Sequence, residues 1–332
     1  MEARELTIAL SPYLFTSREL AAIASIQIAD RVVTILPGAS SRAGSERAAE
    51  VLPRYRKLVA SWAWAEPLLA AGAVAPAWDG DDPMAGVRAV CEEVAEEPAW
   101  LALRPLMRPA LFEREEDTLE VIAADLLKGG PDPGLLIPIS AAIDRFAADH
   151  GIASARSGRA SVAQRAEQRM GTKLFAVALP LLAQAEPERL VEAREVLGPG
   201  LAALRNELAG AAEAVAFDGP GAVDAGLRGR VEAAARAHES RFAASEAALA
   251  RCDDGLDLAV RISTVSVTAH ALPVDAVLWS SAEAAGAMPG GHAVGRGGPA
   301  TSSSAAGSMV HVAGGGNRWV MSLTLRAIGA RG

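Results

Sequence analysis

The chain has 332 residues, of which 51% are hydrophobic and 22% charged, and its formal net charge is −8. This composition is typical of a globular protein with one large domain or two ordinary ones. The acidic balance disfavours general nucleic-acid binding, because a polyanion would be repelled. Cys91 and Cys252 are too few for a disulfide framework and lack metal-ligand spacing, and the start MEARELTIAL lacks the pattern of a signal peptide. We therefore expect a cytoplasmic protein and predict no metal site.

The sequence pattern of residues 1–150 predicts a βαβ-like opening followed by helices. The stretches LTIAL (6–10) and RVVTILPG (31–38) are typical of strands, and a helix is expected between them over 17–29. The later elements predicted in this part are helices at about 53–71, 84–97 and 115–128, a buried strand LLIPIS (135–140) and a helix over 141–151.

The segment 151–173 is predicted to be a basic linker. Between Ala155 and Lys173 it holds five basic residues against the single acid Glu167. Such a cluster can bind a phosphate or an acidic partner, but a mobile charged linker is the simpler interpretation, and we favour it. The candidate anion-binding residues are Arg156, Arg159, Arg165, Arg169 and Lys173.

Residues 174–255 are predicted to form a helical hairpin region. Two stripes of apolar residues recur at three- and four-residue intervals, before and after the turn FDGPGA. Two such stripes joined by a short turn predict an antiparallel pair of helices, with Gly198, Pro199 and Gly200 kinking or dividing the first. The two stripes are Leu190, Leu197, Leu201, Leu204, Leu208, Val215 and then Val223, Leu227, Val231, Ala234, His238, Phe242, Leu249.

Residues 256–332 are predicted to be an apolar C-terminal segment interrupted by a flexible loop. The pattern of 258–279 fits a strand or a helix equally well, whereas 319–328 is typical of a strand. The stretch 286–317 is rich in glycine and serine but has no phosphate-loop spacing, so we expect slack chain.

Other clusters of polar residues have ordinary explanations. Asp79, Asp81 and Asp82 could attract a divalent cation, but a helix N-cap is the favoured interpretation. Ser140, Asp144 and His150 have the residue types of a hydrolase triad without the surrounding motif. The remaining histidines lack ligand spacing, and His238 lies on an apolar stripe, so a core or interface position is favoured.

Four stretches occur in the same order as the landmarks of an uncharacterised bacterial family of unknown function, which the chain resembles. They are SPYLF, ADRVVTILP, PERLVEAREVLGPGLAALRNELA and RWVMSLTLRA. The resemblance covers most of the chain. It implies an αβ opening and a helical body, and it brings no activity and no catalytic residues.

The sequence thus predicts a mainly α protein with a small α/β N-terminal part, an α+β fold. A helical body would carry the long antiparallel hairpin, with short β or apolar segments at the C-terminus.

For function, amphipathic helices without a convergent polar site favour a non-enzymatic interaction or scaffold protein, with a protein partner or self-association through helices and no cofactor. The first alternative is an enzyme or a nucleotide- or phosphate-binding protein. Its site would join the N-terminal strand ends, near Pro12, Arg18 and Asp30, to the arginine-rich segment. The second alternative is peripheral membrane association through 258–279, which carries too many polar residues to be a spanning helix.

Overall fold

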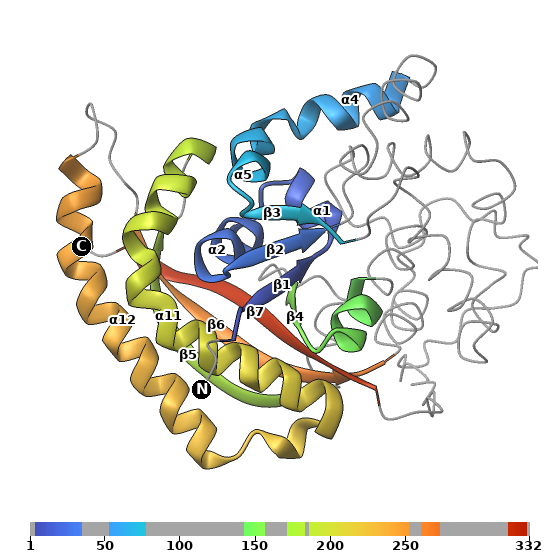
Figure 1. The fold of residues 1–332 in the computed structure, drawn as a ribbon, viewed down its shortest axis with the longest axis vertical. Helices are drawn as coiled ribbons and strands as arrows, with labels where there is room; N and C mark the ends of the chain where they lie inside the picture. Colours follow the sequence, from blue (N-terminus) through green and yellow to red (C-terminus); the bar gives the residue numbers. More distant parts are fainter. Residues whose placement is uncertain are drawn as a thin grey trace, which may run out of the picture.

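The computed structural model describes residues 4–34, 53–77, 143–156, 171–182, 186–251, 260–272 and 318–330. Within these ranges the chain forms one mixed sheet in the order β3-β2-β1-β4-β7-β6-β5 (Figure 1). The strands are β1 (Thr7–Leu10), β2 (Arg31–Thr34), β3 (Val74–Pro76), β4 (Ala153–Arg156), β5 (Thr172–Leu182), β6 (Val260–Ala271) and β7 (Trp319–Ala330). Strands β3, β2, β1, β4 and β7 run parallel, whereas β6 is antiparallel to both β7 and β5.

The expectation of a mainly α protein is wrong, because a seven-stranded sheet organises the described part of the chain as an α/β fold. The error lies in two stretches. The apolar run that forms β5 falls in the predicted helical hairpin region, and the pattern of the segment that forms β6 permits a strand or a helix. The continuous apolar run of β5 does not show a period, and pairing with strands distant in sequence decides the structure of both segments.

The described helices include α1 (Pro12–Thr16) and α2 (Leu20–Ile28), followed by α4 (Pro53–Ser61), the short 3-10 turn η1 (Ala63–Ala65) and α5 (Glu66–Ala70). Residues 143–149 form a helical segment before β4. The hairpin consists of α11 (Pro187–Asp218) and α12 (Ala225–Arg251), joined through η4 (Pro220–Ala222). Helix α11 is not divided at Pro199, which lies inside it.

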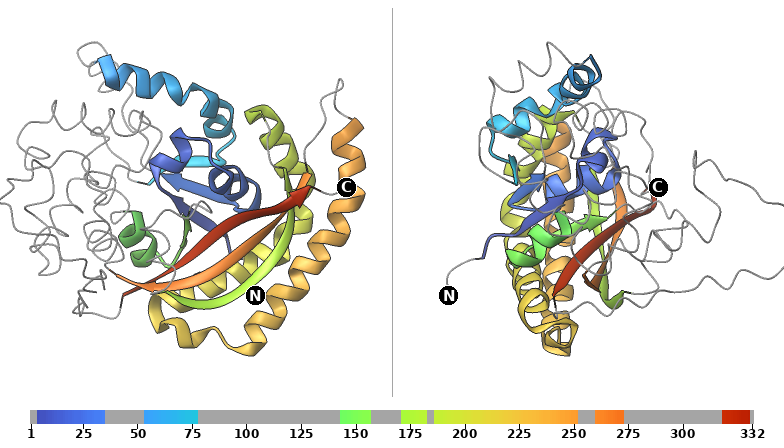
Figure 2. Two further views of the ribbon diagram at one scale, coloured as in Figure 1. Left: turned by 180° about the vertical axis from the view of Figure 1, so that it is seen from behind. Right: turned by 90° about the vertical axis from the view of Figure 1, so that its right-hand side faces the viewer.

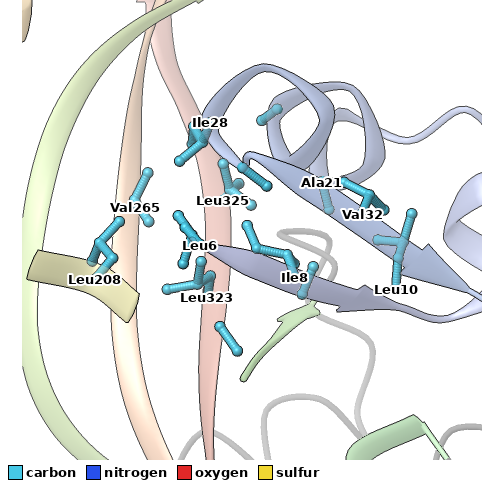
Figure 3. Close-up of a cluster of buried hydrophobic side chains, with 14 of the residues drawn as sticks. Leu6, Ile8, Leu10, Ala21, Ile28, Val32, Leu208, Val265, Leu323 and Leu325 are labelled. Atoms are coloured by element: carbon cyan, nitrogen blue, oxygen red, sulfur yellow. The ribbon is translucent and has the colours of Figure 1, made fainter. Parts of the chain in front are cut away.

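The sheet has an apolar face, which α2 and the hairpin cover (Figure 1 and Figure 2). Directly paired strand residues point to the same side of a sheet, so Leu10, Ala155, Leu323 and Val267 share this face. Figure 3 shows Leu208 of α11 beside Val265 and Ile28 of α2 beside Leu325. The stripe residues from Leu190 to Phe242 are therefore buried within the protein, on the side of the hairpin that covers the sheet.

Several sequence predictions lie outside the described residues. They concern the helices at 84–97 and 115–128, the strand at 135–140, the acidic cluster at 79–82 and the flexible loop at 286–317. In the described ranges no helix is long and apolar enough to cross a membrane. Within the segment 258–279, the structure describes residues 260–272. Nearly all of these residues form β6, which lies between β5 and β7 inside the sheet.

Candidate functional site

In the parallel part of the sheet, the strand order reverses between β1 and β4. From β1 the chain continues to β2 and β3 on one side, and β4 then pairs with β1 on the other side. The connections that leave β1 and β4 therefore diverge at the carboxyl ends of these strands, where α/β proteins commonly bind ligands. Leu10 pairs with Ala155 at this edge, which brings the end of β1, followed by Ser11 and Pro12, beside Arg156.

The face of the sheet opposite the hairpin is lined with hydroxyl groups, and we call it the polar face. Ser154, Ser322 and Thr268 are paired directly across β4, β7 and β6. Arg156, Thr324 and Ser266 form the next row towards the carboxyl ends. Buried members of this face are Ser154, Ser322, Thr324, Thr268 and His270. So many buried polar groups on one face are unusual for a core.

Arg156, on the polar face, contacts two other polar side chains. Its Nη2 donates to Oδ2 of Asp144 at 2.6 Å, and its Nε lies 3.4 Å from Oγ of Ser322. The other carboxylate oxygen of Asp144 accepts a hydrogen bond from Ser154 at 2.7 Å. The side chain of Asp144 is 1% exposed and that of Arg156 is 14% exposed. The 143–149 helical segment thus places a buried carboxylate against the end of β4.

Burial controls the charge states at this site. It raises the pKa of the Asp144 carboxyl above its ordinary value, although the Arg156 charge and hydrogen bonds from Ser154 and Arg156 oppose the rise. Burial, together with the charge of Arg156, lowers the pKa of His270 to about 3. The imidazole is therefore neutral at pH 7. A Cβ at Gly171 would come within 2.4 Å of the His270 ring, so the chain lies tightly against this histidine.

The predicted anion-binding residues fall partly within the described structure. Arg156 ends β4 and Lys173 lies exposed in β5, where it pairs with Thr268 on the polar face. The two ends of the basic segment therefore reach the same face of one sheet. Arg159, Arg165 and Arg169 lie outside the described residues.

Arg18 and Asp30, the predicted N-terminal site residues, lie at opposite ends of α2. Arg18 follows α1 with a φ of 46°, and its guanidinium lies 5.0 Å from the ring centre of Trp64. Asp30 precedes β2, accepts a hydrogen bond from the backbone N–H of Leu6 and pairs with Arg205 at 2.9 Å. Arg18 is thus on the side of the carboxyl ends and Asp30 on the side of the amino ends, where it anchors α11.

The hydrolase-like residues that the structure describes do not converge. Asp144 faces the polar face, whereas His150 stacks on Phe146 and its Nδ1 contacts the Phe146 carbonyl. Ser140 lies outside the described residues. His238 lies on α12 and is buried in the core, as the favoured interpretation predicts.

Sequence reasoning missed the hydroxyl rows of β6 and β7. Their signal is the strict alternation of Val265, Val267 and Ala269 with polar residues in β6, which β7 repeats. In such a pattern the apolar residues form one face of a strand and the polar residues form the other.

Two further features of the described part carry no site. No group of three or more histidine, cysteine or carboxylate side chains in these ranges could hold a metal ion. A shallow pocket of about 390 Å³ lies between α5 and the start of α11, lined in part by Trp64, Glu66, Glu186 and Glu188. Its acids lie at helix N-termini, where the helix dipole already favours them.

No protein-family model, no curated protein and no solved structure matches the chain. This result agrees with the resemblance to a family of unknown function.

Proposed function

We propose that the protein binds a small anionic molecule at the carboxyl ends of β1, β4 and β7, as a ligand-binding protein or an enzyme of the α/β class. The observation that carries the proposal is the position of Arg156. It ends the strand that pairs with β1 where the sheet changes direction, which is the usual ligand position in open parallel sheets.

The surroundings of Arg156 suit an anion. A guanidinium offers five donors in a planar fork that matches carboxylate and phosphate groups. Hydroxyl groups of Ser322, Thr324 and Ser266 lie on the same face, and that of Ser266, which is only half-buried, can donate to a ligand oxygen. Part of the Arg156 side chain remains exposed, so an external anion can reach it.

The hairpin gives less support to a scaffold function. The leucines of its first stripe, such as Leu201 and Leu208, are buried against the sheet rather than available to a partner. Among the described residues, the only large hydrophobic side chain that is exposed is Phe217. A helix-in-groove interaction needs a row of apolar anchors, so the amphipathic pattern is explained by the fold itself.

The test is a thermal-shift screen with inorganic phosphate, nucleotides, phosphorylated sugars and dicarboxylates. A ligand that binds only the folded state raises the melting temperature in a saturable way. Arg156→Lys keeps the positive charge beside Asp144 but loses the planar fork, and we expect it to weaken binding at least about tenfold. Arg318→Lys is the matched control, because Arg318 forms an exposed pair with Asp149 at the other end of β7.

We expect Arg318→Lys to bind like the wild type. A screen in which no anion stabilises the wild type, or in which Arg156→Lys binds as tightly as the wild type, would contradict the proposal.

A further inference from the structure

Asp144 already makes with Arg156 the contact that an anionic ligand would make. The 2.6 Å distance between Nη2 and Oδ2 is that of a charge-assisted hydrogen bond. A carboxylate of the chain therefore occupies the guanidinium that the proposed function assigns to the ligand.

We propose that Asp144 is an internal competitor at the anion site, which holds Arg156 until a ligand anion takes over part of its guanidinium. The inference rests on the proposed function and adds the regulation of that site. Asp144 would lower the affinity for anions at neutral pH and make the site selective for ligands that compete well with a carboxylate.

The contacts of Asp144 support this role. Its second oxygen is held by Ser154 at 2.7 Å, so the carboxylate keeps a hydrogen-bond donor when Arg156 turns towards a ligand. Asp144 is almost completely buried, whereas Arg156 reaches the surface. An external anion can therefore approach the arginine without passing the aspartate.

The charge balance also supports it. While Asp144 is ionised, the pair is neutral and attracts an anion weakly. When Asp144 is protonated or replaced by a neutral group, a negative charge beside the guanidinium is lost, so Arg156 attracts an external anion more strongly. Burial favours the neutral carboxyl, because it raises the pKa of Asp144.

The other groups around the pair limit how pH can act. His270 on β6 stays neutral because its pKa is about 3. The 143–149 segment carries Arg145 and the exposed Asp149, which pairs with Arg318, and the exposed His150 follows it. Among the described residues of the polar face, Ser154 of β4 and Ser322 of β7 contact the pair, and the charged Arg326 of β7 and Lys173 of β5 lie further along this face.

The experiment is a titration of the full chain with sulfate, which stays dianionic between pH 8 and about pH 4.5. Asp144→Asn removes the charge and keeps the size and hydrogen-bonding capacity of the side chain. We expect it to bind sulfate at least about tenfold more tightly than the wild type near pH 7.5. The control is Asp149→Asn, which makes the same change on the same segment and should bind like the wild type.

The pH series supplies the second readout. Wild-type affinity should rise more steeply than that of Asp144→Asn as pH falls, because only the wild type has a carboxyl at position 144 that can take up a proton. If Asp144→Asn does not fold, a wild-type affinity that does not rise at any pH at which the protein stays folded overturns the inference.

The outcomes separate the two proposals. Wild-type binding through Arg156 with no gain in Asp144→Asn overturns the competitor role and leaves the proposed function standing. Absence of sulfate binding in both proteins overturns the competitor role, because removal of the Asp144 charge should let the guanidinium bind sulfate, whereas the proposed function is decided by the anion screen.

Discussion

At the scale of single residues, His238 shows how burial links stability to pH. The ring is 1% exposed and neither nitrogen has a hydrogen-bond partner, although the carbonyl of Pro180 lies near it. Burial lowers the pKa of His238 to about 4, and the charge of Arg205 acts in the same direction. The unfolded chain therefore binds a proton between its ordinary value of 6.5 and about pH 4, whereas the folded chain does not.

The resulting prediction concerns the free energy of unfolding. His238 contributes its full stability above pH 6.5 and loses it progressively as pH falls to about 4. For this one group, the loss between pH 7 and pH 5 is about 2 kcal/mol. Denaturant unfolding at both pH values measures it, with His238→Phe as the comparison, because phenylalanine has a similar shape and no titration. An equal pH dependence in both proteins would show that the histidine is not desolvated.

At the scale of elements, two arginines of α11 hold the end of α2. Arg194 donates to the carbonyls of Ile26, Ala29 and Asp30. Arg205 donates to the carbonyls of Gln27 and Ile28 and to the Asp30 carboxylate. The last carbonyls of a helix have no partner within the helix, so these contacts satisfy them and join α2 to the hairpin.

We predict that Arg205→Met destabilises the protein by about 2–4 kcal/mol, because it leaves Asp30 and buried carbonyls without their donor. Arg236→Met on the exposed side of α12 is the control and should change stability by less than about 0.5 kcal/mol, since its pair with Glu232 is exposed and 4.0 Å long. Chemical denaturation of both variants gives the comparison. Equal effects of the two changes would refute the anchoring role.

The same elements show how far the sequence predicts the structure. β1, β2, α2 and the two hairpin helices have local signals, namely apolar periodicity and glycine or proline at their ends. β5 has no such signal, because its continuous apolar run shows no period, whereas β6 alternates apolar and polar residues but is also long enough for a helix. Pairing decides both, because β6 pairs with β7 from the far end of the chain and β5 pairs with β6. The candidate site likewise depends on contacts between residues that are distant in the sequence. Asp144, Ser154 and Ser322 carry no motif. The helical segment before β4 places Asp144 against Arg156, and the register of β4 and β7 places Ser322 beside it.

At the scale of the whole molecule, one sheet joins the N-terminal βαβ unit to the C-terminal strands. β7 lies between β4 and β6, so the last strand of the chain completes the polar face. The hairpin closes the apolar face, and the polar face, with Arg156 at the strand ends, takes the position that ligands occupy in related architectures. We propose that Arg156 contacts an anionic small molecule at this position.

Native mass spectrometry of the purified full chain, followed by extraction and identification of what it carries, tests this claim most directly. We expect the wild type and Arg318→Lys to retain an anionic small molecule, and Arg156→Lys to lose most of it while remaining folded by circular dichroism. Identical small-molecule content in the wild type and in folded Arg156→Lys would contradict the proposed function.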